Sequence, residues 1–317
     1  MAQVSGQGTA WNLLNVAGDL YTADVLATPI LSMIGGMNGG LQTSNFEFPV
    51  SSEYDFPAES QPALTETDSL TAPTAVAAVR SQVKNVCQIY QQAVQLSYEK
   101  LANSGRLTGI NTVGSGNNIV DELAFQIDYN MKIIARNIEE TILNGVYQIA
   151  TNAGTANKTR GLMAACDLSG GTAIDASAAD LDKDLMKQLF REMHAAGAMM
   201  DGLVIVCNGY QKQILSDIYG FAPEDREIGG LNIKQLLTDF GNVGIMQAHR
   251  FMDNDSILVM QPAVVNPVFQ PTPGKGNFFV EELAKTGASE NYMIFGKFGL
   301  DHGPAFMHGK ITNLATS

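Results

Sequence analysis

The strongest periodic signal in the sequence lies between residues 118 and 149. Apolar side chains recur there every three or four residues and keep to one stripe, which is the pattern of an amphipathic helix with one buried face. The stripe consists of Ile119, Leu123, Ile127, Met131, Ile134, Ile138, Ile142 and Ile149. We therefore predict one helix of about thirty residues, roughly 45 Å long, with Asn152 and Gly154 as its stop signals.

From Ser177 to the strand expected near 257–261, short apolar runs alternate with amphipathic segments, which predicts a second α/β unit. Ser177 and Asp180 have the spacing of a capping box, and we expect them to open its first helix. The elements expected after that helix are a buried strand at 202–208, a helix at 210–220, a polar segment at 221–232, and strands near 243–249 and 257–261. The chain from residue 264 onward is rich in strand patterns.

The N-terminal part of the chain predicts an arm followed by a hairpin. Residues 11–34 are helix-prone in short pieces with apolar anchors, and the glycine-rich segment 35–40 ends them. Residues 46–50 (FEFPV) predict a strand that Pro49 restricts to an edge position. Residues 83–97 (VKNVCQIYQQAVQLS) predict a returning strand, so the two strands and the polar stretch between them form one long hairpin.

Acidic residues concentrate in this hairpin. Residues 43–73 carry six acids, four prolines and no lysine or arginine. The first 79 residues hold eight acids and no base, whereas the remaining 238 hold 24 acids and 19 bases. A limb of about 27 residues reaches at most roughly 90 Å, while a compact chain of this length has a radius of gyration of about 20 Å. We therefore expect the hairpin, and the apolar arm before it, to find their partner on another copy of the chain.

Composition and charge exclude several classes of protein. With 45% hydrophobic and 16% charged residues, the chain can bury a sizeable core and still presents weakly polar surface suited to protein–protein contact. The net charge of −13 argues against tight binding of nucleic acid through phosphate neutralisation. Three distant cysteines indicate buried apolar side chains in a reducing compartment. The sequence has no signal-peptide pattern and no apolar run long enough to span a membrane, so we expect cytosolic synthesis and no membrane partner.

No residue pattern indicates a catalytic, cofactor or metal site. The histidines fall in no HExxH motif and have no cysteine pair nearby, so we interpret them as surface or hydrogen-bonded side chains. They are His194, His249, His302 and His308. GKGN at 274–277 lacks the helix and hydroxyl of a phosphate loop and predicts a flexible turn. Glu139 and Glu140 lie beside Arg136 on an expected outer face, which favours a solvated or interface position over acid–base chemistry. We therefore predict that the protein is not an enzyme.

Five segments in a particular order carry a resemblance to a known family. They are NVCQIYQQAVQLS (85–97), ELAFQIDYNMKIIARNIEETILNG (122–145), RGL (160–162), TDFGNVGIM (238–246) and LAKTGAS (283–289). Together with the order of arm, acidic hairpin, long helix, α/β unit and strand-rich end, they resemble the major capsid proteins of tailed bacteriophages, whose fold encapsulin shells share. The resemblance covers nearly the whole chain and implies the α+β major capsid protein fold.

The implied fold divides the chain into functional parts. They are an N-terminal arm at 1–42, an extended loop at 43–97, a peripheral domain with a long spine helix at 98–175, an axial domain at 176–263, and the C-terminal strands of the peripheral domain at 264–317. In this fold the extended loop lies over a neighbouring subunit. The tip of the axial domain lines the five- and six-fold axes.

The resemblance implies a structural protein that self-assembles, as hexamers and pentamers, into an icosahedral head enclosing packaged double-stranded DNA. Confinement rather than specific binding would hold the DNA. The shell would assemble in the host cytoplasm and become the virion capsid, with a portal protein, decoration proteins and a separate scaffold protein as further partners. The alternative is an encapsulin-like compartment that stores a cargo enzyme. A soluble enzyme is a third interpretation, which the lack of a catalytic constellation disfavours.

The expected contacts between subunits lie in the loop, on the long helix and at the axial tip. Aromatic anchors and acids of the loop should meet a neighbour's long helix, where Lys132 and Arg136 lie one turn apart. The loop residues are Phe46, Phe48, Glu53, Tyr54, Asp55, Phe56 and Glu59. The axial residues, which could pair across a ring of identical copies or form a solvated turn, are Glu224, Asp225, Arg226 and Glu227. Because the loop has no lysine, we expect its contacts to be non-covalent.

Overall fold

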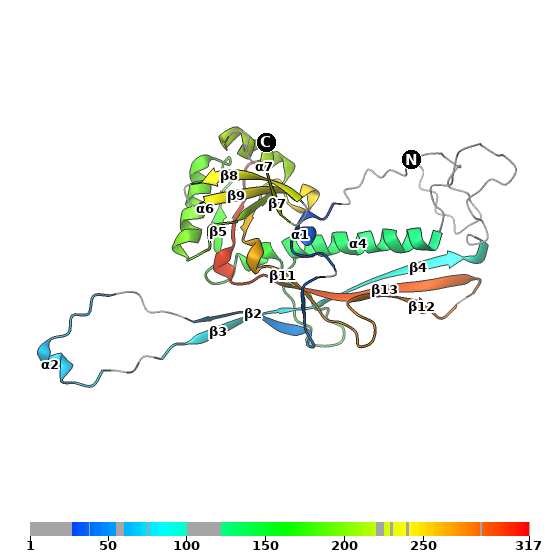
Figure 1. Cartoon of the computed structure of the whole chain (residues 1–317), viewed down its shortest axis with the longest axis horizontal. Coiled ribbons are helices and arrows are strands. Elements are labelled where there is room, and N and C mark those ends of the chain that lie inside the picture. Colours follow the sequence, from blue (N-terminus) through cyan, green and yellow to red (C-terminus); the bar gives the residue numbers. More distant parts are fainter. Residues whose placement is uncertain are drawn as a thin grey trace.

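The computed structural model describes residues 27–37, 39–54, 60–73, 75, 77–99, 122–219, 225–228, 231–238, 241–285 and 287–316. They form an elongated body that contains a five-stranded and a seven-stranded sheet, and one loop projects far from this body (Figure 1). The chain therefore has the mixed α+β architecture that its sequence predicts.

The five-stranded sheet is built around its longest strand, β13 (Ser289–Asp301), which pairs antiparallel with three other strands. These are β4 (Gln88–Ser97), β12 (Phe278–Leu283) and β11 (Asn266–Phe269), and β1 (Leu41–Gln42) pairs parallel to β11. The long helix α4 (Glu122–Asn144) lies along one face of this sheet (Figure 1). The predicted apolar stripe explains the packing, because Ile134, Ile138 and Ile142 are buried in the core that helix and sheet share.

Helix α4 ends earlier than predicted. It stops at Asn144, well before Asn152, while its predicted start at 118–121 lies outside the described residues. Two backbone segments cross closely just after the helix. A Cβ atom at Gly145 would lie 2.5 Å from the carbonyl oxygen of Thr159, so only glycine permits this crossing. The helix therefore ends where the backbone at Gly145 meets the backbone at Thr159. The periodicity of the helix alone could not reveal this contact.

The predicted returning strand is divided between two sheets. Its first part belongs to β3 (Arg80–Val86), which pairs with β2 (Glu47–Tyr54) in a two-stranded hairpin. Its second part is β4 of the five-stranded sheet. The break falls at Cys87, the last of three consecutive buried residues, where the alternation of a single strand is lost. The hairpin that carries the loop therefore ends at Val86, not at residue 97.

The seven-stranded sheet forms a wall between two apolar cores. Its strands, in spatial order, are β5 (Thr172–Asp175), β14 (Gly309–Thr312), β10 (Ile257–Met260), β6 (Val204–Cys207), β9 (Gly241–Gln247), β8 (Leu231–Thr238) and β7 (Asp225–Ile228). Strand β6 is wholly buried: Val204 and Val206 face the core shared with α4, whereas Ile205 and Cys207 face a second core. Helices α6 (Lys183–Ala195) and α7 (Gly209–Tyr219) contribute buried side chains to that second core.

Two strands of this sheet come from segments that the sequence assigned to the peripheral domain. Strand β5 lies within 98–175 and β14 within 264–317, yet the two pair with each other at one side of the seven-stranded sheet. Strand β14 also pairs with β10. The sheet therefore extends beyond the predicted range of 176–263, because its edge is completed by strands distant in sequence.

The first helix of the predicted α/β unit begins later than its expected capping box. The N-cap of α6 is Asp182, whose carboxylate accepts a hydrogen bond from Leu185 N at 2.7 Å. Ser177 and Ala178 instead have positive φ angles of 52° and 63° and belong to a turn. The predicted cap at Ser177 and Asp180 is therefore wrong, although the helix itself is present.

The described part of the N-terminal arm packs on its own chain. The short helix α1 (Pro29–Met33) lies against α4, and Ile30 and Leu31 are buried in the shared core. Strand β1 then extends the five-stranded sheet. The expectation of an arm without a partner in its own chain is therefore wrong for residues 29–42, while residues 11–26 lie outside the described residues.

Candidate assembly surfaces

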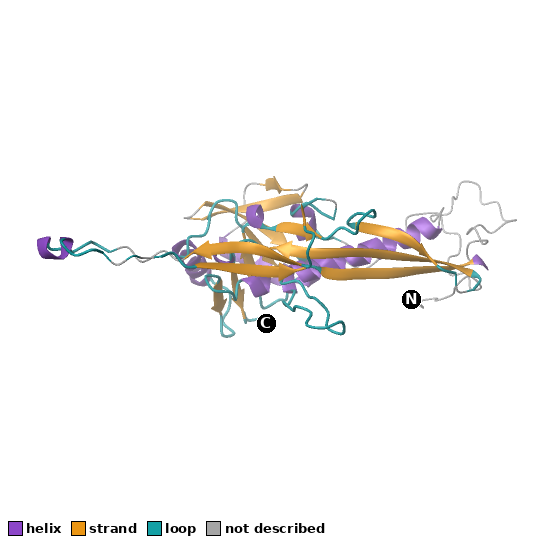
Figure 2. Ribbon diagram, turned by 90° about the horizontal axis from the view of Figure 1, so that it is seen from below, coloured by secondary structure: helices purple, strands orange, loops and turns teal. Residues whose placement is uncertain are grey.

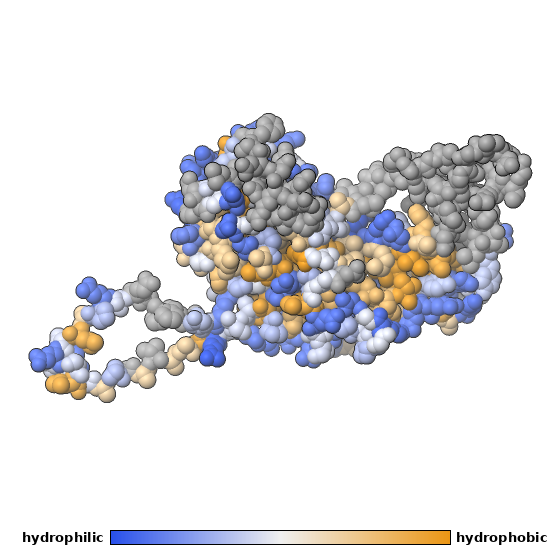
Figure 3. Space-filling view, in the orientation of Figure 1, coloured by the Kyte–Doolittle hydropathy of each residue, from blue (hydrophilic) through white to orange (hydrophobic). Residues whose placement is uncertain are grey.

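The projecting loop makes the largest candidate surface. Beyond the paired ends of β2 and β3, the chain runs away from the body to a distant tip (Figures 1 and 2). The tip is the four-residue helix α2 (Glu66–Ser69), none of whose residues is buried. The large side chains that flank it, Leu64 and Leu70, are 76% and 85% exposed. Apolar residues lie open at this tip (Figure 3), and no surface among the described residues of the same subunit covers Leu64 and Leu70.

A local network holds the tip helix in shape without help from the body. Thr65 is its N-cap and receives the N–H of Asp68 on its hydroxyl oxygen, while Thr65 N donates to the Asp68 carboxylate, each at 3.2 Å. The Thr65 hydroxyl also donates to the Asp68 carboxylate at 2.6 Å. This hydrogen bond, together with the one from Thr65 N, holds the pKa of the Asp68 carboxyl below its usual value. The motif is a capping box with an aspartate in the usual glutamate position. The tip is therefore a preformed element, which lowers the entropy lost when it docks.

The predicted aromatic anchors of the loop divide between its surface and the interior of the body. Phe46 and Tyr54 are 48% and 62% exposed, as an anchor for a neighbour requires. Phe48 is buried, packing with Cys87 and Val268. A Cβ atom at Gly299 would lie 2.7 Å from the Phe48 ring, so this glycine provides the space for it. Phe48 is therefore a core residue, and its prediction as an intersubunit contact is wrong.

Of the loop acids predicted as contacts, the structure describes only Glu53. Glu53 is half-buried on β2 and accepts a hydrogen bond from Ser51 Oγ at 3.2 Å. Asp55, Phe56 and Glu59 lie outside the described residues. The intersubunit contacts predicted for Asp55, Phe56 and Glu59 therefore stay proposals.

The two bases on α4 have different surroundings. Lys132 pairs with Asp128 one turn earlier, at 2.6 Å, and its side chain is half exposed. Arg136 is half-buried one turn later on the same helix. Part of the charge that was expected to attract a neighbour's loop is therefore already neutralised within the helix.

Glu139 is buried, although the sequence predicts a solvated or interface position for it. Its carboxylate is fully buried between α4 and α1, where it accepts hydrogen bonds from Ile30 N at 2.8 Å and Leu31 N at 2.7 Å. Burial raises the pKa of Glu139 to about 7, although the two N–H donors act in the opposite direction. Glu140 is exposed, as predicted, and accepts from Asn144 Nδ2 at 2.9 Å. Glu139 therefore fastens the arm to the long helix.

The predicted axial tip coincides with the end of the seven-stranded sheet. Asp225, Arg226 and Glu227 lie on β7, whose backbone pairs with β8 in the register Arg226 to Ile233. Strand β7 is the last strand in the spatial order of this sheet. Glu224 lies outside the described residues. The three described residues therefore occupy an edge strand, and their contacts between copies remain a proposal.

Two buried histidines join the connections between the sheets. The chain passes from β10 to β11 through Pro262–Val264 and from β13 to β14 through Ala305–Met307. Gln261 N, on the first connection, donates to His308 Nδ1 at 3.4 Å. The Nε2 atom of His308 then bonds to the carbonyl oxygen of His302 at 2.6 Å. This arrangement, which we name the histidine bridge (His302 and His308), agrees with the predicted hydrogen-bonded role.

We expect the free energy of unfolding to fall as the pH is lowered from about 6.5 to about 4. Burial lowers the pKa of both His302 and His308 to about 4 from the ordinary 6.5. Between these values the unfolded histidines bind protons that the folded ones do not, so stability is lost on acidification. Each histidine contributes a slope of up to about 1.4 kcal/mol per pH unit. Glu139 and Asp301, whose pKa values are raised in the folded protein, contribute slopes of the opposite sign and reduce the net change. Urea unfolding of the purified protein between pH 7.5 and 4.5 measures this slope.

A matched pair of variants tests whether the histidine bridge causes this pH dependence of the free energy of unfolding. His308→Gln should reduce the pH dependence by about one proton's contribution, whereas His194→Gln, at an exposed position on α6, should leave it close to that of the unaltered protein. An unaltered slope in His308→Gln would show that the acid sensitivity arises elsewhere.

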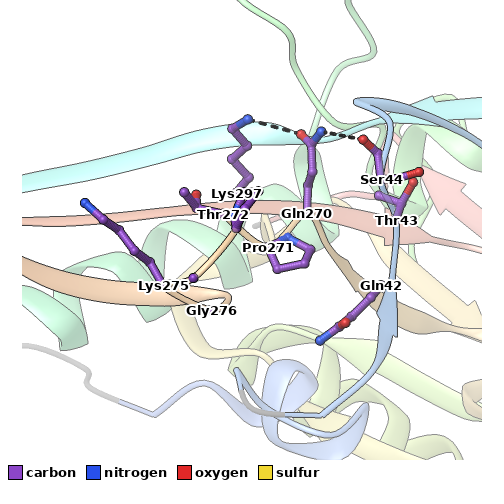
Figure 4. Close-up of a pocket in the computed structure, with 11 residues that line it drawn as sticks. Gln42, Thr43, Ser44, Gln270, Pro271, Thr272, Lys275, Gly276 and Lys297 are labelled. Carbon is purple, nitrogen blue, oxygen red and sulfur yellow. Dashed lines mark hydrogen bonds between the residues drawn. The ribbon is translucent and has the colours of Figure 1, made fainter.

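A hollow of about 890 Å³ opens beside the five-stranded sheet (Figure 4). It is lined by the end of β1, by the turn at 270–276 and by Lys297 of β13. Lys297 Nζ donates to Gln270 Oε1 at 3.3 Å, and Gln270 Nε2 donates to Ser44 O at 3.2 Å. Two lysines line this hollow, and one of them, Lys275, is paired with the Glu281 carboxylate. The predicted turn at 274–277 is confirmed as a turn that forms one wall.

Three further observations concern chemistry within the described residues. The cysteines Cys87, Cys166 and Cys207 are buried and unpaired, as predicted, and burial raises the pKa of each thiol to about 12. In the part of the chain that the structure describes, no three His, Cys, Asp or Glu side chains gather as a metal site would require. None of the helices described is both long and apolar enough to cross a membrane.

Comparison with known proteins identifies one matching family model and solved structures of similar fold at low sequence identity. A family model described as SU10 major capsid protein matches residues 3–315. The capsid of Cyanophage A-1(L) has 11% identity and a TM-score of 0.65, covering 96% of this chain and 98% of that chain. The capsid of Myoviridae phage XM1 has 12% identity and a TM-score of 0.55, covering 94% and 96%.

An encapsulin also shares the fold. The holo-SrpI encapsulin complex from Synechococcus elongatus has 12% identity and a TM-score of 0.58, with 97% of this chain and 94% of that chain covered. At such identities the likeness to solved structures establishes the fold alone. The sequence has no match among curated proteins.

Proposed function

Because the chain belongs to the SU10 major capsid protein family, we propose that its projecting loop joins copies into the pentamers and hexamers of a closed head shell. The protein is a structural component of a bacteriophage capsid, and copies of it assemble into that capsid. The observation that carries the proposal is the loop itself. Its tip helix is exposed on every side and carries Leu64 and Leu70 far from its own body.

Apolar contacts should contribute more than charges to this joint. Burying a leucine side chain contributes about 1.5–3 kcal/mol, whereas an exposed ion pair contributes about 0–1 kcal/mol. Each copy supplies one loop, so a weak contact is repeated throughout the shell. The exposed aromatic residues Phe46 and Tyr54 would add to the apolar share.

The partner surface proposed from the sequence is α4 of a neighbouring copy, where Glu53 or a nearby acid would meet Lys132 and Arg136. At the axes, Arg226 and the acids around it would meet between copies around the ring. The edge position of β7 supports the second of these contacts, because an edge strand can face a neighbour. The pairing of Lys132 with Asp128 weakens the first.

The remaining partners follow from the role of a shell. The capsid would enclose double-stranded DNA without specific binding, because the net charge of −13 repels phosphates. A scaffold protein, a portal protein and decoration proteins would act with it during assembly in the host cytoplasm. We propose no enzymatic activity. The encapsulin-like alternative rests on a fold that phage capsids share, and no separate observation favours it.

We expect purified protein to form capsomers or closed shells held together without covalent bonds. The loop between residues 43 and 79 contains no lysine, so it lacks the amine for an isopeptide crosslink. Electron microscopy should show shells, and the same particles boiled in denaturant should give one monomer band on a gel. High salt should loosen the shells only in part, because salt screens charges but not apolar contacts. A ladder of covalent oligomers would contradict the non-covalent joint, and an absence of both capsomers and shells would contradict the proposed function.

A further inference from the structure

Two connections between the sheets lie against each other. The first passes from β10 to β11 through residues 261–265, and the second passes from β13 to β14 through residues 302–308. Figure 1 shows the second connection, in red, where the two sheets meet. A Cβ atom at Gly303 would lie 2.9 Å from the Cβ atom of Val264, so the connections pack closely. A change in the contact between them therefore acts at the junction of the sheets.

Hydrogen bonding fixes the tautomer of His308. The backbone N–H of Gln261 can only donate, so the Nδ1 atom of His308 carries a lone pair. The carbonyl oxygen of His302 can only accept, so the Nε2 atom of His308 carries the proton. The ring is fully buried. His308 is therefore neutral, and its acceptor nitrogen ties the second connection to the first.

His302 is also neutral, and one of its nitrogen atoms has no partner among the described residues. Its Nδ1 atom lies 2.8 Å from the carbonyl oxygen of Gly303 and therefore donates to it. This leaves a lone pair on Nε2, which is buried and unpaired within the described structure. A proton on this atom would create a buried, charged donor without an acceptor, which is costly. Both rings are thus held neutral while the junction is closed to water.

The charged groups on the surrounding segments act in both directions. Burial lowers the pKa of His302 to about 4, and the neighbouring His308 and Arg160 act in the same direction. Burial raises the pKa of the Asp301 carboxyl, so the closed junction takes up that proton readily and Asp301 opposes opening in acid. Asp201 is exposed on the segment that Gln261 contacts, and Lys310 of β14 pairs with Asp167 at 2.7 Å. The histidines are therefore the groups of this set that gain protons when the junction opens.

We propose that the histidine bridge is an acid-sensitive latch between the two connections. When a proton binds to Nδ1 of His308, the ring carries an N–H group at both nitrogen atoms, and the N–H of Gln261 faces another donor. The tie between the connections is then lost, and water reaches both rings. The strands on either side stay in place, because side chains such as Leu258 and Phe298 belong to the core that the sheets share. Acid thus loosens the junction while both sheets remain folded.

Hydrogen exchange of the purified protein at pH 7 and pH 5 tests the latch, after correction for the exchange rates of unstructured peptides at each pH. Peptides that cover the two connections should lose protection by about twentyfold on acidification, the factor by which one ring with its pKa moved from 6.5 to about 4 favours the open form. Low concentrations of urea should leave this exchange unchanged, because a local opening exposes little surface. The same urea should speed the exchange of β6, which is wholly buried.

A pair of variants tests whether the ring of His308 is the cause. His308→Gln keeps one acceptor and one donor group at this position but binds no proton between pH 7 and pH 5. Its loss of protection on acidification should therefore be smaller than that of the unaltered protein by about twentyfold. His194→Gln, at an exposed position on α6, is the matched control and should keep the full loss.

The comparison of peptides within the unaltered protein decides the matter even where a variant fails to fold. Faster exchange of the connections than of β6 at pH 5, without urea dependence, supports the latch. Exchange of the connections at the rate and with the urea dependence of β6 would overturn it, because only global unfolding would then expose them. An undiminished loss of protection in His308→Gln would also overturn it.

Discussion

Replacing residues 55–79 with a two-residue Asn-Gly turn should abolish closed shells while leaving a folded subunit. Tyr54 and Arg80 are paired at the end of the hairpin, so a two-residue turn of this type closes it in register. The removed residues contribute no side chain to the apolar cores of the described structure, so the subunit should keep its stability. Each copy loses the burial of two leucines, about 3–6 kcal/mol per joint. Electron microscopy and sedimentation velocity measure the loss of shells.

The control for this replacement is a loop of the same length with a different surface. Leu64→Ser combined with Leu70→Ser keeps the chain and its acids but removes the apolar contact. We expect it to assemble poorly as well, with the circular dichroism spectrum of the unaltered protein. Normal shells from the turn variant would contradict the role of the loop. If only the serine variant formed normal shells, the charged residues of the loop, rather than its two leucines, would stabilise the contact between subunits.

Glu139→Gln should release the arm from the long helix and destabilise the subunit by about 2–4 kcal/mol. The carboxylate accepts two N–H groups, from Ile30 and Leu31, whereas an amide offers one acceptor and turns its own donors toward the second N–H. A buried donor left without an acceptor is costly. Hydrogen exchange of the peptide 28–37 should become about a hundredfold faster, which corresponds to roughly 2.7 kcal/mol of lost protection.

The neighbouring glutamate provides a control on the same helix. Glu140 is exposed and contacts Asn144, so Glu140→Gln should change neither the exchange of the arm nor the stability by more than about 0.5 kcal/mol. Equal exchange rates in both variants would show that the arm is held by the packing of Ile30 and Leu31 rather than by the carboxylate.

The sequence predicted those parts of the fold that depend on local periodicity. The isoleucines at 134, 138 and 142 identified the long helix. Short apolar runs identified β6, β9 and β10 of the seven-stranded sheet, whereas β5, β7 and β8 were not predicted. It missed features made by distant segments. The partners of Glu139 lie 109 and 108 residues away, so no spacing could indicate them. One signal was available: Ala135 and Leu143, one turn before and after Glu139, are apolar, which places it at the border of the buried face.

The errors in the candidate contacts have a similar origin. Phe48 was taken as a loop anchor because aromatic residues alternate along its strand, but a glycine at 299 on β13 opens the space that buries it. Cys87 divides what looked like one strand, because the chain passes there from one sheet to another. Leu64 and Leu70 escaped notice because the segment between the prolines is poor in large apolar residues, and their importance comes from exposure, which only the structure reveals.

Electron cryomicroscopy of the assembled shell tests the central claim most directly, which is that the partner of the loop is another copy of the chain. The account predicts that the tip helix at Glu66–Ser69 lies on the body of a neighbouring subunit, with Leu64 and Leu70 covered. A tip that folds back onto its own subunit, or that stands free in solvent in closed shells, would contradict it.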